Sequence, residues 1–106
     1  MSSVTYVQDN EFASLIEAEP IVVVDFTATW CGPCKKVSPM MDQLAIDYES
    51  RAKVVKVDVD QNKGVAKQFG IRSIPAVLVF KSGELVETLV GMNPYEKFVA
   101  TLNQHL

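Results

Sequence analysis

Apolar residues along the chain form two kinds of pattern, which are continuous runs and helically spaced positions. The longest run covers residues 21–26 and is interrupted only by Asp25, which predicts a strand covered on both faces of its sheet. From Cys34 onward, apolar residues recur every three or four positions, and this predicts a helix of about 15 residues. Pro33 suits the first turn of that helix, whereas Pro39 lies in its interior and is expected to kink it. A central strand therefore leads into the longest helix.

Shorter patterns predict the remaining elements. They are an edge strand at residues 5–7, a helix capped by Asp9 and broken by Pro20, a strand at 54–59, a helix at 62–69 ended by Gly70, and strands at 74–80 and 85–90 joined as a hairpin. A final helix follows, in which Asn93 is the expected cap, Pro94 fills the first position and Glu96 completes a capping box. The order β-α-β-α-β-α-β-β-α predicts an α/β fold, with a mixed sheet and helices on both faces.

Size and charge narrow the classes of protein and partner. The 106 residues are enough for one domain, residues 1–106, with a core that needs no disulfide staple. The 10 Lys and Arg residues are scattered among 13 Asp and Glu residues, and the net charge of −3 argues against nucleic acid as a partner. No signal peptide is evident, and the longest apolar run is far too short to span a membrane. We therefore expect a reducing, cytoplasmic compartment, where a paired thiol is more often catalytic than structural.

Both cysteines lie in residues 30–35, Trp-Cys-Gly-Pro-Cys-Lys. A disulfide between them closes a very short loop, so it would stabilise the fold little. A structural zinc site takes four ligands, whereas the chain offers two cysteines and His105, which leaves only a metal shared between two chains as an alternative. The spacing of the two thiols instead indicates a redox pair.

The two thiols are expected to have different roles. Cys31 lies at the predicted start of the helix, where free backbone N–H groups and the helix dipole favour an anion and lower the pKa of a thiol. Cys34 lies one turn further in, on the apolar stripe with Val37 and Met41, so it should be the shielded partner. Cys31 would then attack a substrate disulfide, and Cys34 would resolve the mixed disulfide.

Three further residues are ambiguous from spacing alone. Asp25 is either a proton shuttle beneath the pair or a buried carboxyl satisfied by Lys56 in the neighbouring strand, and the two roles are compatible. Trp30 is either a core residue or part of a rim that contacts substrate. Pro75 opens a strand, where its missing N–H does least harm, and the rarity of cis X-Pro bonds predicts a trans peptide.

Across essentially its full length, the chain resembles the thioredoxin family. The segments that carry the resemblance are residues 22–26, 28–35, 56–60, 70–75 and 90–91. A lone CxxC is weak evidence, but the six-residue motif joined with a later Ile-Pro and a glycine after the last strand is highly specific. The resemblance implies the thioredoxin fold and a general protein disulfide reductase, with no cofactor or metal beyond its redox-active disulfide.

The resemblance also implies roles for individual residues. It makes Asp25 the proton shuttle with Lys56 as its neighbour, and it reverses the expectation for Pro75, which the family has as a cis proline packed against the disulfide. The backbone of Ile74 is expected to pair with an extended substrate segment, a mode that selects little for sequence. Many client proteins would follow from such pairing.

Around the pair, Gly32 and Pro33 are expected to shape the loop, and Trp30, Gly91 and Met92 an apolar rim. The Gly-Pro dipeptide favours a reductase over relatives with a His there, although an oxidase, an isomerase and a binding module in a larger assembly stay open as alternatives. Partners implied by the resemblance are disulfide-containing client proteins and a thioredoxin reductase, either NADPH- or ferredoxin-dependent, with the protein itself a monomer. The departures from the family pattern at Thr27 and Ala76 leave client preference open.

Overall fold

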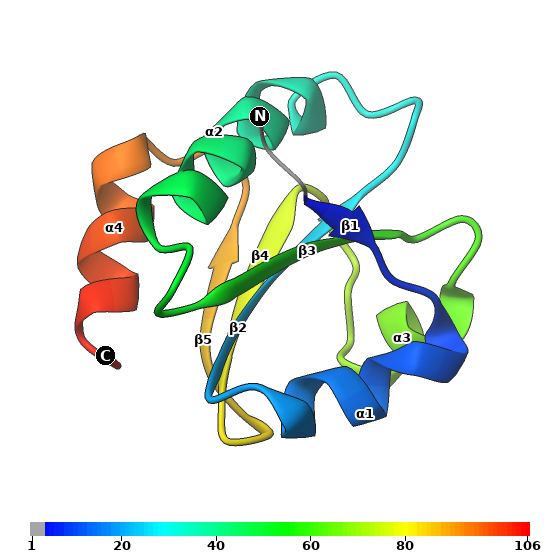
Figure 1. Cartoon of the computed structure of the whole chain (residues 1–106). Coiled ribbons are helices and arrows are strands. Elements are labelled where there is room, and N and C mark those ends of the chain that lie inside the picture. The colour runs from blue at the N-terminus through cyan, green and yellow to red at the C-terminus, as the bar shows by residue number, and fades with distance from the viewer. Residues whose placement is uncertain (1–3) are drawn as a thin grey trace.

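A mixed β-sheet of five strands, with helices on both faces, is the framework of the described residues 4–106 in this computed structural model (Figure 1). In chain order the elements are β1 (Thr5–Tyr6), α1 (Asp9–Ala18), β2 (Ile21–Thr27), α2 (Cys34–Asp47), β3 (Lys53–Asp58), α3 (Lys63–Gln68), β4 (Ala76–Lys81), β5 (Glu84–Val90) and α4 (Tyr95–Asn103). The predicted order of strands and helices is confirmed, including the placement of Pro39 inside α2.

The sheet places β2 at its centre, in the strand order β1-β3-β2-β4-β5. The pairs β1–β3 and β2–β3 are parallel, whereas β4 runs antiparallel to both β2 and β5. Every residue of β2 is buried, as the unbroken apolar run predicts. The carboxyl end of this fully covered strand leads directly into the cysteine loop.

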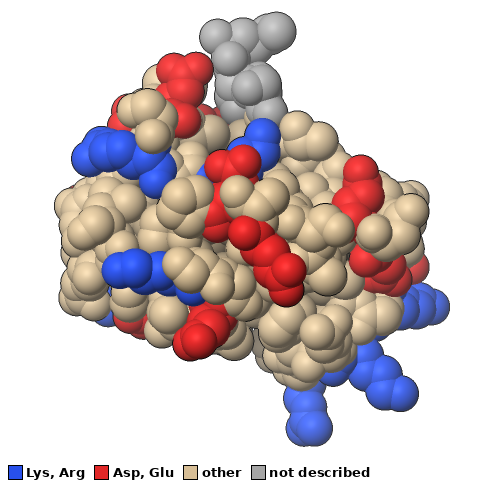
Figure 2. All heavy atoms as spheres, turned by 60° about the horizontal axis from the view of Figure 1, so that its bottom comes forward, with Lys and Arg blue, Asp and Glu red and all other residues tan. Residues whose placement is uncertain are grey.

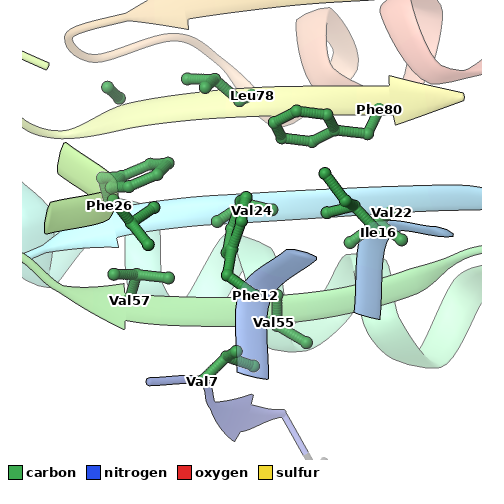
Figure 3. Close-up of a cluster of buried hydrophobic side chains, with 12 residues drawn as sticks. Val7, Phe12, Ile16, Val22, Val24, Phe26, Val55, Val57, Leu78 and Phe80 are labelled. Carbon is green, nitrogen blue, oxygen red and sulfur yellow. The ribbon is translucent and has the colours of Figure 1, made fainter. Parts of the chain in front are cut away.

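Two apolar clusters cover the two faces of the sheet. On one face, alternate residues of β2, which are Val22, Val24 and Phe26, pack with Phe12 of α1 and Phe80 of β4 (Figure 3). On the other face, the intervening residues of β2 pack against α2 and α4. Because both faces of β2 are occupied by side chains from helices, the strand and the loop that follows it have a fixed position.

The predicted cap of α1 is wrong in detail. Asp9 is the first residue of the helix, and the backbone N–H of Gln8 donates to Glu11 Oε1 at 2.9 Å. The Asp9 carboxylate instead accepts hydrogen bonds from the backbone N–H groups of Gly64 and Val65, at 3.3 and 2.9 Å. The Asp9 carboxylate therefore caps the start of α3 and not that of α1, because two N–H groups without a partner inside α3 point at it.

The predicted capping box of α4 is also wrong. Pro94 is the residue that precedes the helix, and no side chain caps it. The Asn93 amide donates to the carbonyl oxygen of Gly91 at 3.4 Å, so it stabilises the turn after β5 and not the helix. The hairpin between β4 and β5 is confirmed, with Ser82 and Gly83 in the left-handed conformation at its turn.

Charged side chains are scattered among uncharged ones on the side of the molecule that carries α1 and α3 (Figure 2). Within residues 4–106, no helix is both long and apolar enough to cross a membrane.

Candidate active site

The cysteine loop is a tight turn between the end of β2 and the start of α2. The backbone N–H of Cys31 donates to the carbonyl of Ala28 at 3.2 Å, and the N–H of Lys35 donates to the carbonyl of Gly32 at 3.1 Å. Pro33 precedes the helix with φ −61°, the value its ring imposes and α-helices share. Gly32 and Pro33 therefore lie between the cysteines, in a loop whose turns lead directly into α2.

Cys31 and Cys34 are joined by a disulfide, with their Cα atoms 5.3 Å apart. Cys34 is the first residue of α2 and is 1% exposed, whereas Cys31 lies before the helix and is 4% exposed. The backbone N–H of Cys34, one of the free donors of the first turn, points at Cys31 Sγ at 3.2 Å. Cys34 is buried as expected, but Cys31 is buried nearly as well, so exposure does not distinguish the two sulfurs. What distinguishes them is the start of the helix, whose N–H is directed at the sulfur of Cys31.

The peptide bond between Ile74 and Pro75 is cis. The trans bond expected from the general rarity of cis X-Pro is wrong, and the cis bond implied by the family resemblance is confirmed. Ile74 packs on the cysteines, and its carbonyl oxygen lies 3.8 Å from Cys31 Sγ. The carbonyl oxygen of Pro75 accepts a hydrogen bond from the N–H of Gly91 at 2.8 Å. This bond brings the turn after β5 beside the cis proline.

Trp30 and Met92 are surface residues. Trp30 is 68% exposed and Met92 52% exposed, so the alternative that Trp30 belongs to the core is wrong. The indole N–H of Trp30 donates to Asp60 Oδ2 at 2.7 Å, a contact that the sequence did not suggest. The exposed ring of Trp30 is therefore held in place by the carboxylate of Asp60. Gly91, the third predicted residue of the rim, has φ +83°, a conformation that favours glycine.

Asp25 is fully buried in the central strand, and neither of its carboxyl oxygens has a hydrogen-bond partner among the described residues. Burial raises its pKa from 3.8 to about 7, since the carboxylate loses its hydration; Lys56 lowers the pKa and Asp42 raises it, both by smaller amounts. A carboxyl with this pKa exchanges a proton near neutral pH, which is the property a general acid or base needs.

Lys56 lies directly opposite Asp25 in the register of β2 and β3, as its proposed role as a neighbour requires. The alternative that Lys56 satisfies Asp25 by a direct bond is wrong, because its ammonium donates to Ser38 Oγ at 2.5 Å and to Asp42 Oδ1 at 3.1 Å. The sequence analysis missed Ser38 and Asp42. Ser38 follows Cys34 by four residues and Asp42 follows Ser38 by four, and this spacing is the signal that places them on one face of the helix.

No group of three or more His, Cys, Asp or Glu side chains in residues 4–106 is arranged to hold a metal ion.

Comparisons with known proteins cover nearly the whole chain. A family model described as Thioredoxin matches residues 3–104. The thioredoxin of the red alga Porphyra purpurea is 47% identical over 105 residues, which are 98% of each chain. Thioredoxin 1 of Nostoc sp. is 45% identical over 107 residues and 100% of each chain, and the thioredoxin of Staphylococcus epidermidis is 43% identical over 104 residues, 98% of this chain and 99% of the other.

Proposed function

Because the chain belongs to the thioredoxin family and is a thiol-disulfide oxidoreductase that reduces protein disulfides, we propose that Cys31 is its attacking thiolate and Cys34 its resolving thiol. The observation that carries this assignment is the N–H of Cys34 directed at Cys31 Sγ at 3.2 Å. In the dithiol, a backbone donor at a helix start favours the thiolate over the thiol at that sulfur. Among the described residues, no backbone N–H donates to the sulfur of Cys34 in the same way.

Two exchange steps follow from these roles. The Cys31 thiolate attacks one sulfur of a client disulfide, so that a Cys31–client bond forms, the client S–S bond breaks, and the departing client thiolate takes up a proton. Cys34 then gives up its proton and attacks Cys31 Sγ, which forms the Cys31–Cys34 disulfide and releases the second client thiolate for protonation. Two electrons pass from the dithiol to the client in this sequence.

Asp25 is the proposed proton acceptor for Cys34 in the second step. Its pKa of about 7 lies close enough to neutral pH for the carboxyl to take a proton and give it up again. It lies on the strand that leads into the cysteine loop, with Lys56 beside it. The buried position and absence of a bonded partner among the described residues support a group that is free to exchange a proton.

Client binding is proposed to use the backbone of Ile74 together with an exposed rim. Within residues 4–106 the N–H of Ile74 makes no hydrogen bond, so an extended client segment can pair with it without disturbing the fold. Trp30, Gly91 and Met92 are the proposed rim, supported by the exposure of the two large side chains. Contact through backbone atoms and a small apolar rim suits many different clients.

The electron supply is proposed to be a thioredoxin reductase that draws on either NADPH or ferredoxin. We further propose that the protein acts as a monomer of one domain in the cytoplasm, without a cofactor and without nucleic acid or membrane as partner. The net charge of −3 supports the exclusion of nucleic acid, and the two-cysteine composition supports a reducing compartment.

The thiol roles are tested by trapping the intermediate. Cys34→Ser, reduced and mixed with a protein that has an accessible disulfide, should accumulate a mixed disulfide through Cys31, detected by non-reducing electrophoresis and peptide mass spectrometry. Cys31→Ser is the matched control and should give no adduct. Equal trapping by both variants, or trapping by Cys31→Ser alone, would contradict the assignment.

A further inference from the structure

Cys34, Ser38 and Asp42 follow one another at intervals of four along one side of α2, which runs from the buried Cys34 to the partly exposed Asp42. The side chain of Lys56 reaches this side of α2 from β3 and donates to both Ser38 Oγ and Asp42 Oδ1, at 2.5 and 3.1 Å. The Lys56 side chain is only 7% exposed, whereas that of Asp42 is 42% exposed. A nearly buried ammonium is thus bound to the helix that carries the resolving cysteine.

The same ammonium belongs to the strand residue opposite Asp25. Both side chains are on the α2 side of the sheet, since the residues two positions before them, Val23 and Val54, belong to the cluster under α2. An ammonium and a carboxyl so placed usually form an ion pair. Here both Asp25 oxygens are without a hydrogen bond from any described residue, while two of the three ammonium donors are used on α2.

We propose that Ser38, assisted by Asp42, is a positioning residue that holds the Lys56 ammonium against α2 and thereby keeps the Asp25 carboxyl free of a direct ion pair. The inference rests on the proton transfer proposed above for Asp25, and it assigns to α2 the control of that transfer. Ser38 acts through Lys56 and does not touch the reacting sulfur in this role.

The charges around Asp25 give the tether a definite direction of effect. On β3, the residue opposite Asp25 is Lys56. On β4, the residue opposite is the uncharged Val77. The helix packed over this face, α2, carries Cys34, Ser38 and Asp42. Without the Ser38 hydroxyl, the ammonium can turn toward the Asp25 carboxylate, which lies opposite it in the sheet and has no hydrogen-bond donor among the described residues. A direct ion pair would stabilise the carboxylate and make its proton harder to retain.

The tether also lies next to the reacting residues. Cys34 and Ser38 line one surface pocket of about 160 Å³, together with Thr27 and Lys35. The residue that holds Lys56 and the cysteine that must lose its proton therefore line the same pocket. Movement of the ammonium would therefore change the electrostatic field on the side of the sheet where the proton transfer is proposed.

The test follows the titration of Asp25 by carboxyl ¹³C NMR in the oxidised protein. In Ser38→Ala we expect the midpoint of Asp25 to fall, by about 1 to 3 pH units when the ion pair forms fully. Asp42 is left in place, because loss of its carboxylate would by itself lower the Asp25 pKa. Ser38→Thr retains the hydroxyl and should retain the wild-type midpoint. Alanine is a good helix former, so Ser38→Ala is expected to fold.

Lys56→Met supplies the control, because it removes the ammonium through which Ser38 is proposed to act. In a Lys56→Met background, Ser38→Ala should leave the Asp25 midpoint unchanged. A midpoint that stays at the wild-type value in Ser38→Ala, or that falls as far in Ser38→Ala when Lys56 is absent, overturns the tether. Unchanged thiol-exchange rates in Asp25→Asn would instead refute the proton transfer proposed for Asp25, so the two failures are distinguishable.

Discussion

The carboxyl of Asp25 makes the stability of the fold depend on pH. Its pKa is about 7 in the folded protein because of burial, and near the ordinary 3.8 in the solvated, unfolded chain. Between these values the folded state binds more protons than the unfolded state, so the free energy of unfolding falls as the pH rises. The free-energy cost of burying the Asp25 charge is absent below about pH 3.8 and complete above about pH 7.

Asp25→Asn removes this charge and should stabilise the oxidised protein most at high pH. We expect the free energy of unfolding to increase by at most about 4 kcal/mol near pH 8, and by less than about 1 kcal/mol near pH 4. Urea unfolding of both proteins at the two pH values measures the difference, and thiol-exchange kinetics should be slower in the variant. An equal gain at both pH values would show that the effect does not come from the carboxylate charge.

At the scale of elements, α1 and α3 depend on each other for their first turns. The Asp9 carboxylate binds two N–H groups at the start of α3, and the Asn62 side chain accepts a hydrogen bond from the N–H of Asp9 at 2.8 Å. α3 is only six residues long, too short to be stable by itself. Its persistence therefore depends on contacts from outside the helix.

Asp9→Ala should destabilise the protein by about 1 to 2 kcal/mol, the usual cost of losing a side chain that caps a helix. Hydrogen exchange at the amides of Gly64 and Val65 should accelerate more than exchange in β2. Asn10→Ala, at the next and exposed position of α1, is the matched control and should have little effect. Equal destabilisation by both changes would mean that α1 itself is weakened, and not the cap of α3.

The central strand, the longest helix and the helix caps show how far local sequence predicts this fold. β2 and α2 were predicted because their patterns are set by burial, which repeats every residue in one and every three or four residues in the other. The caps at Asp9 and Asn93 were wrong, because a short polar side chain bonds whichever N–H or carbonyl lies nearest in space. The tether at Lys56 was missed for the same reason, since its partners on α2 come close only in the folded chain.

At the scale of the whole molecule, the sheet separates two apolar cores, one on each of its faces. Leu78 of β4 is 1% exposed and belongs to the cluster under α1 and α3, whereas Leu85 of the neighbouring β5 is 43% exposed. The two leucines are on adjacent strands of one hairpin and differ mainly in burial. They therefore compare the interior of the molecule with its edge.

Leu78→Ala should lower the free energy of unfolding by about 2 to 5 kcal/mol, because it removes buried contacts and leaves a cavity at the centre of the sheet. Leu85→Ala should change it by about 0.5 kcal/mol or less. Chemical denaturation followed by circular dichroism measures both values. Similar losses in the two variants would show that the exposed edge contributes as much to stability as the central strands do.

The hydrogen bond between Trp30 and Asp60 has an optical consequence. Trp30 is the chain's single tryptophan, and it is adjacent in sequence to Cys31. Because its indole is fixed by Asp60 and largely exposed, the emission of the protein reports the surroundings of one ring beside the disulfide. We therefore expect the intrinsic fluorescence of the chain to change with the redox state of the pair, and also with client binding if clients contact the proposed rim.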